Sequence, residues 1–246
     1  MALPKIDVPI HTVDLPLTKK TVRFRPFLVK EEKLLLMAME SQEEKTILES
    51  IKQVLNNCCL DDIDIGGLPT SDLEFLFLNL RARSIGEIVE LQYKCNNKVS
   101  DEAGQEKTCN HVVKFDLNIL EVKPEILPNH SAKIELSKDL GIMMKYPNIA
   151  SIQKIETNEG SDIEKIMSIV TECIDFIYDA DSIYYKKDIS NEELDEFIGS
   201  LTRDQFGKVQ EFFDTMPKIK KIVPFTCGKC GYKEDITIEG IQNFFG

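Results

Sequence analysis

The sequence of 246 residues has no tryptophan, only three histidines, and no long uninterrupted apolar stretch. A helix that crosses a membrane needs about 20 consecutive, mainly apolar residues, and no segment approaches that length. The opening MALPKIDVPI also lacks the basic start and apolar centre of a secretory signal. We therefore expect a protein that is made in a reducing cytoplasm and does not enter a membrane.

Sequence signatures of catalysis are missing as well. There is no HExxH motif, no glycine-rich phosphate loop and no GxSxG motif. No nucleophilic residue is accompanied by a recognisable base. We predict that the protein is not an enzyme.

Basic residues are in the minority, with 30 lysines and arginines against 42 aspartates and glutamates, for a net charge of −12. Phosphate backbones repel such a protein, so nonspecific binding to nucleic acid is disfavoured. Apolar residues make up 42% of the chain, enough for a sizeable core. The composition predicts a globular protein whose partners are other proteins.

Apolar periodicity predicts an α+β fold, in which N- and C-terminal helical regions flank a β unit built from two chain segments. Cysteine pairs at the strand ends make this β unit zinc-ribbon-like. The predicted parts are a strand plus helices in 1–84, the β unit in 85–120 and 221–246, a mixed β and short-helix segment in 121–160, and a helical region in 161–220.

Helix starts are predicted from capping boxes, in which Ser or Thr is followed three residues later by Glu or Gln. Helix starts are predicted from pairs of this kind at Ser41 with Glu44, Ser71 with Glu74, Ser190 with Glu193, and Thr202 with Gln205. A longer helix is predicted over residues 162–180, because its apolar side chains follow helical spacing through Ile177.

The cysteines give the clearest indication of a functional site. The seven cysteines are an odd number and do not suggest a secreted disulfide scaffold. Cys95 ends one predicted strand, Cys109 starts the next, and Cys227 and Cys230 form a CxxC turn between two further strands. Four thiolates at strand ends suit a closed tetrahedral zinc site, which is usually structural. We predict one structural zinc per chain at these four residues.

The exact ligand set is open at this point. Thirteen residues separate the first two cysteines, so the polar loop between them must bulge outward. His111 could replace one sulfur, or the cysteines could lie in the core without a metal. A redox CxxC is disfavoured, because no helix pattern follows Cys230. Gly228 and Gly231 are expected to supply positive φ angles in the turn.

Two Phe-Phe pairs occur near the ends of elements, in EFFDTMP and in the terminal IQNFFG. Core packing is the default interpretation of both. Chain ends usually lie at the surface, however, and aromatic side chains are enriched at interfaces. Phe244 and Phe245 are therefore the candidate partner-binding residues.

Three quoted segments, in this order, carry a family resemblance: TVRFRPFLVKEEKLLLMAMES, LRARSIGEIVELQYKC and FTCGKCGYKEDITIEGIQNFF. The chain resembles the baseplate hub proteins of T-even-type bacteriophages over nearly its whole length. The resemblance implies a structural or assembly role at the centre of a contractile tail's baseplate. The implied partners are other hub proteins and the tape measure protein. The implied locations are the host cytoplasm during assembly and the baseplate of the virion tail.

The competing hypothesis is a zinc-ribbon regulator that binds nucleic acid. The lysines of KIKK at residues 218–221 could form a local basic patch, although the overall charge opposes this role. A metal-dependent hydrolase is disfavoured, because four thiolates leave no open coordination position for a reacting water.

Overall fold

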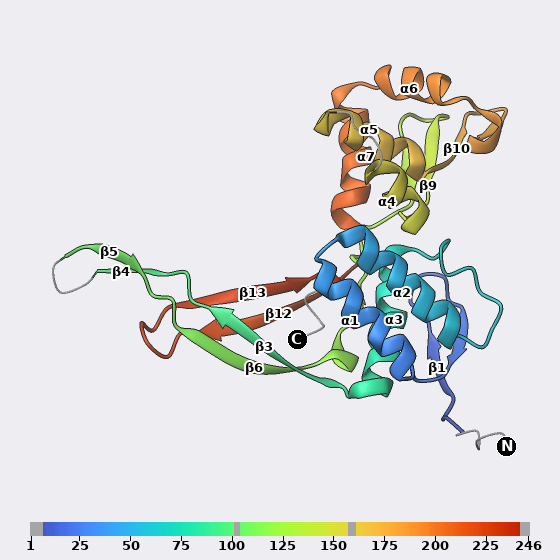
Figure 1. The fold of residues 1–246 in the computed structure, drawn as a ribbon. Helices are drawn as coiled ribbons and strands as arrows, with labels where there is room; N and C mark the ends of the chain where they lie inside the picture. Colours follow the sequence, from blue (N-terminus) through green and yellow to red (C-terminus); the bar gives the residue numbers. More distant parts are fainter. Residues whose placement is uncertain (1–6, 101–103, 157–160, 242–246) are drawn as a thin grey trace.

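The computed structural model describes residues 7–100, 104–156 and 161–241 (Figure 1). An N-terminal helical body, a long β arm and a C-terminal body can be distinguished in it. This mixture of helices and small sheets agrees with the predicted α+β class. Among the described residues, no helix combines the length and the apolar composition needed to cross a membrane.

The N-terminal body contains a β-hairpin and three helices: β1 (His11–Asp14), β2 (Thr21–Phe24), α1 (Val29–Ser41), α2 (Glu44–Cys58) and α3 (Thr70–Ile85). Its core includes Phe24, Ile51, Leu55 and Leu76. Asp72 in the first turn of α3 accepts hydrogen bonds from the backbone N–H groups of Leu17 and Thr18, at 2.9 and 2.8 Å. These two hydrogen bonds fasten the β1–β2 turn to α3. The carboxylate is also favourable near the N-terminus of a helix.

The arm is made of two antiparallel ribbons from distant parts of the sequence. One pairs β3 (Ile88–Lys94) with β6 (Val112–Asn118), and the other pairs β12 (Lys218–Thr226) with β13 (Lys233–Glu239). Alternate side chains of the two ribbons meet in a narrow apolar layer that includes Val89, Leu117, Ile219 and Ile238. The arm is attached to the N-terminal body through Leu78 and Ala82 of α3.

Short elements surround the two ends of the arm. At its base lie η1 (Ile119–Glu121) and β7 (Pro124–Glu125), and β7 pairs with the start of β12. At its far end lie β4 (Lys98–Ser100) and β5 (Glu106–Thr108), which pair with each other. The segment between Cys95 and Cys109 was expected to be a polar loop that bulges outward, and its described residues include the paired strands β4 and β5, which project from the tip (Figure 1).

The C-terminal body packs helices against an antiparallel sheet with strand order β11-β10-β9-β8. The strands are β8 (Lys133–Glu135), β9 (Gly141–Met144), β10 (Ile174–Tyr178) and β11 (Ile183–Tyr185). The helices are α4 (Ile149–Glu156), α5 (Asp162–Cys173), η2 (Lys186–Asp188), α6 (Asn191–Gly199) and α7 (Arg203–Thr215). Ile142, Ile174, Leu194, Val209 and Phe212 are buried in its core.

The helix predicted over residues 162–180 is wrong in its second half. α5 ends at Cys173, and the next residues form β10, which pairs with β9 on one side and β11 on the other. Ile174 and Ile177 are both buried, so their spacing of three fitted a helix as well as it fits this irregular strand. The sequence IDFIY is rich in β-branched and aromatic residues, which favour strands.

Candidate metal centre

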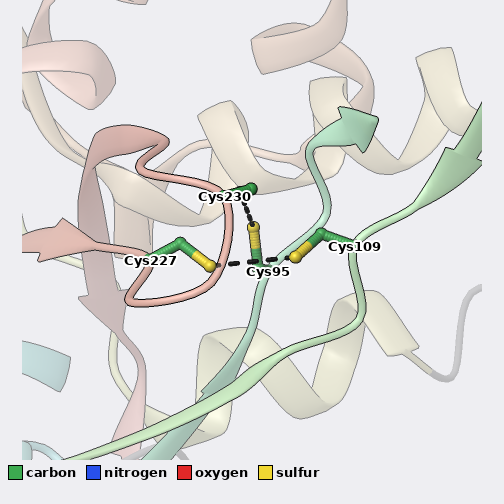
Figure 2. Close-up of side chains that lie close together, drawn as sticks. All are labelled: Cys95, Cys109, Cys227 and Cys230. Carbon is green, nitrogen blue, oxygen red and sulfur yellow. Dashed lines mark hydrogen bonds between the residues drawn. The ribbon is translucent and has the colours of Figure 1, made fainter. Parts of the chain in front are cut away.

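Four cysteines meet at the far end of the arm, where the two ribbons turn (Figure 2). Cys95 and Cys109 come from the β3–β6 ribbon, and Cys227 and Cys230 come from the turn between β12 and β13. All four Sγ atoms lie within 4.8 Å of one another. The structure therefore brings together the four side chains that the sequence predicted.

The sulfur–sulfur distances suit a metal better than a covalent bond. Sγ of Cys95 lies 3.7 Å from Sγ of Cys230, and Sγ of Cys109 lies 3.8 Å from Sγ of Cys227. Ligands about 2.3 Å from a tetrahedral zinc ion are separated by about 3.8 Å. A disulfide would need about 2.05 Å, and all four cysteines are free thiols. The donor set and its spacing fit zinc.

The two cysteine turns have matching backbone hydrogen bonds. In the second turn, the carbonyl of Cys227 accepts from Gly231 N–H at 2.9 Å, and Cys227 N–H donates to Tyr232 O at 2.8 Å. In the first turn, the corresponding distances are 3.0 Å, from Asn110 N–H to Cys95 O, and 2.9 Å, from Cys95 N–H to His111 O. The two pairs of cysteines are thus presented by equivalent backbone geometry, despite their different spacing in sequence.

A residue with a left-handed backbone follows the second cysteine of each turn. Gly231 has φ 73°, as the sequence predicted, and Asn110 has φ 55°. Asparagine is one of the few residues with a side chain that adopts this conformation readily. Sequence reasoning overlooked Asn110, although its position directly after Cys109 matches that of Gly231 after Cys230. The same expectation for Gly228 is wrong, because its φ is not positive.

The unusual spacing of the first pair results from an inserted hairpin. Strands β4 and β5 pair Lys98 with Thr108 and Ser100 with Glu106. Cys109 N–H then donates to Asn97 O at 2.8 Å, which closes the hairpin next to the cysteines. The insertion lengthens the turn without changing the positions of its two thiols.

Backbone amides donate hydrogen bonds to three of the four sulfurs. Three sulfurs accept a hydrogen bond from the N–H group two residues later: Cys95 from Asn97, Cys109 from His111, and Cys230 from Tyr232. The bond from Tyr232 lowers the pKa of Cys230 to about 6, whereas burial raises the pKa of Cys95 to about 12. This hydrogen bond favours the thiolate of Cys230, which is the metal-binding form.

Aromatic and polar side chains support the cysteine cluster. The rings of Tyr93 and Phe225 meet edge to face with centroids 4.8 Å apart, and the Tyr93 hydroxyl donates to Glu234 at 3.0 Å. The side-chain amide of Asn97 donates to Sγ of Cys230 at 3.7 Å. These contacts join the two ribbons next to the cysteines. The sequence analysis identified the cysteines but none of these supporting residues.

His111 lies beside the second turn but outside the cluster. A Cβ atom added to Gly228 would lie 3.8 Å from His111 Nε2. Within the described parts of the chain, the group of neighbouring metal-ligating atoms consists of the four thiols and does not include this imidazole. Four sulfurs fill a tetrahedral set without an open position, which is the arrangement of a structural site.

The two Phe-Phe pairs have different outcomes. Phe212 is buried in the C-terminal core, and Phe213 packs against it, as the default interpretation stated. The candidate partner-binding residues Phe244 and Phe245 lie outside the described residues, so their role stays a prediction.

Comparisons with known proteins identify the family. Neither the curated proteins nor the solved structures gave a significant match to this chain. The sequence profile described as T4 bacteriophage base plate protein matches residues 8–246, which is nearly the whole chain. The chain therefore belongs to the T4 bacteriophage base plate protein family.

Proposed function

We propose that the protein is a structural or assembly component of the central hub of the baseplate, and that it acts by binding other tail proteins. The observation that carries this proposal is the family match over residues 8–246. The partners would be other hub proteins and the tape measure protein. The protein would act in the host cytoplasm during assembly and could then stay in the virion tail.

We also propose that Cys95, Cys109, Cys227 and Cys230 bind one structural zinc ion per chain. The support is the donor set, its 3.7–3.8 Å spacing and the matched turns. Apart from the cysteines, Phe225 is the buried member of the apolar cluster at the tip. Two ribbons with so little apolar contact gain most from a metal cross-link, because two-stranded ribbons are marginally stable alone.

A nucleic-acid-binding role gains no support from the arm. Each lysine of the KIKK segment lies near a glutamate: Lys218 with Glu239 at 4.0 Å, Lys220 with Glu125 at 3.2 Å, and Lys221 with Glu121 at 3.8 Å. These lysines are thus partly neutralised by their neighbours. The arm segments 86–118 and 218–241 together hold nine acidic and nine basic residues, a net charge of zero.

The test is quantitative mass spectrometry of purified virions and of tail-assembly intermediates, separated by sedimentation from infected cells. We expect the protein to sediment with hub proteins in at least one of these samples. A fixed small copy number in virions would identify a permanent component, and presence in intermediates alone would identify an assembly factor. If the protein sediments alone in every fraction, the proposed function is wrong.

A further inference from the structure

The negative charge of the chain is concentrated in one part of the C-terminal body. Residues 161–204, which include α5, β10, β11 and α6, contain twelve acidic and four basic residues. This segment therefore carries −8 of the chain's net −12. Such an asymmetry attracts cationic partners and orients them on approach.

A groove opens between α5 and α6 within this acidic segment. It has a volume of about 470 Å³ and is lined mainly by Ile163, Glu164, Met167, Thr171, Glu172 and Asp195. Figure 1 shows α6 at the end of the molecule opposite the N-terminal body, and the cysteine cluster lies on the separate arm. A partner in the groove would therefore leave the metal centre accessible.

Apolar side chains contribute to the lining of the groove. Ile163, which is 73% exposed, and the partly buried Met167 lie four residues apart on α5, and both line the groove. They offer a partner an apolar contact with polar residues around it.

The acidic residues of the groove differ in how far they are already neutralised. Glu172 is paired with Lys154 and Lys186, both at 3.2 Å. On α6, by contrast, Glu192, Asp195 and Glu196 are exposed, and Asp195 accepts a hydrogen bond of 3.4 Å from the Thr171 hydroxyl. Glu192 lies three residues before Asp195 and four before Glu196, so these three carboxylates lie along one side of α6 and can face one partner together.

We propose that this groove binds a cationic amphipathic helix of another tail protein. Apolar side chains of that helix would cover Ile163 and Met167, and its lysines or arginines would reach Glu192, Asp195 and Glu196. Charge complementarity selects a cationic occupant over a second copy of this acidic chain. This inference rests on the proposed function, because it names the surface through which the protein joins the tail.

The experiment places a photoreactive benzoylphenylalanine at Ile163 and supplies this variant during infection by a phage that lacks the wild-type gene. Mass spectrometry then identifies the cross-linked peptide in the assembled tail fraction. The control carries the same group at Ile222, which is 54% exposed on the arm. We expect the Ile163 position, and not the control, to label a segment with Lys or Arg among apolar residues at helical spacing.

A charge-reversal pair tests the electrostatic part of the proposal. Glu192→Lys with Glu196→Lys should lower the cross-linking yield at Ile163 about tenfold. The matched control is Glu87→Lys with Asp235→Lys, which changes two exposed carboxylates of the arm and should leave the yield unchanged. Circular dichroism verifies that both double variants are folded.

The outcomes separate this inference from the proposed function. Labelling of an acidic segment, of another copy of the chain, or of nothing at all in a fraction that contains the protein overturns the groove proposal only. An unchanged yield in the Glu192 and Glu196 double variant also overturns it. If the protein is absent from every tail fraction, the proposed function fails as well.

Discussion

The β arm and the C-terminal body stabilise themselves in different ways. The arm is two ribbons thick, has no net charge over residues 86–118 and 218–241, and ends in four cysteines. The C-terminal body surrounds a core that includes Ile142, Val209 and Phe212, and its surface carries most of the net charge. A thin arm cannot bury many apolar side chains at its tip, so the proposed metal would take the place of a core there. The body has a core of its own, and we propose that its acidic surface serves recognition.

The largest expected effect is the loss of the metal from the arm. Cys227→Ser removes one of the four thiolates and should abolish zinc binding. The effect should be large, because structural zinc in zinc-finger peptides contributes about 10–16 kcal/mol of apparent binding free energy. Hydrogen exchange measured by mass spectrometry should then accelerate in β12 and β13 near the tip and remain unchanged in β9 and β10. Faster exchange everywhere would show that the two regions are not independently stabilised.

A matched control for this substitution is Cys173→Ser in the C-terminal body, where Cys173 is buried. Burying a hydroxyl in place of this thiol should weaken the body by about 1–3 kcal/mol. The zinc content should remain one per chain. Loss of zinc in this variant would mean that the metal is bound elsewhere or depends on the whole fold.

The second prediction weakens the body and leaves the arm intact. Phe212 is buried, and its ring stacks on Tyr146 with centroids 5.7 Å apart. Phe212→Ala should lower the free energy of unfolding of the body by about 3–5 kcal/mol. Zinc retention against a chelator should equal that of the wild type. If zinc retention falls in parallel with the stability of the body, the arm and the body are not independently stabilised.

The third prediction concerns the junction between the arm and the N-terminal body. Burial raises the pKa of Glu74 on α3 to about 7, and the charge of Glu239 on β13 adds to the shift. The folded protein therefore holds a proton that the unfolded chain has already released between about pH 4.5 and 7. Stability from this residue is present at low pH and is lost as the pH rises through 7.

Glu74→Gln removes this dependence, because the amide stays neutral. The free energy of unfolding of the variant relative to the wild type should increase from pH 5 to pH 8 by about 2 kcal/mol. Denaturant titrations at several pH values measure the difference. A difference that is constant with pH would contradict the assigned ionisation.

The smallest predicted effect is at the left-handed residue of the first cysteine turn. Asn110→Val places a β-branched side chain at φ 55°, which should cost about 1–2 kcal/mol and lower zinc retention correspondingly. Asn110→Gly tolerates the same φ and should retain zinc as the wild type does. Equal retention in both variants would show that the backbone of this turn does not determine the metal site.

The parts of the fold that depend on local chemistry could be predicted from the sequence. The capping boxes Ser190–Glu193 and Thr202–Gln205 are both present. The four cysteines were identified because thiols at strand ends have a specific chemical meaning. In both cases, a few neighbouring residues carry the information.

Other parts depend on distant residues and could not be predicted in this way. α3 begins at Thr70, so Ser71 lies within the helix and does not cap it. The N–H group of Thr70 donates to Pro147 O, at 3.0 Å, from a distant part of the chain. α2 likewise begins at Glu44 without a cap from Ser41. The strand Ile174–Tyr178 exists because β9 and β11 pair with it. Tertiary contacts thus override local patterns at these positions.

Native mass spectrometry of the purified protein tests the central claim most directly. We expect one bound zinc ion per chain in the wild type and none in Cys227→Ser. Removing the metal with a chelator should also loosen the tip of the arm, which hydrogen exchange on the same samples would detect. A wild-type protein that contains no metal, yet protects β12 and β13 as well as the zinc-loaded sample does, would contradict the account.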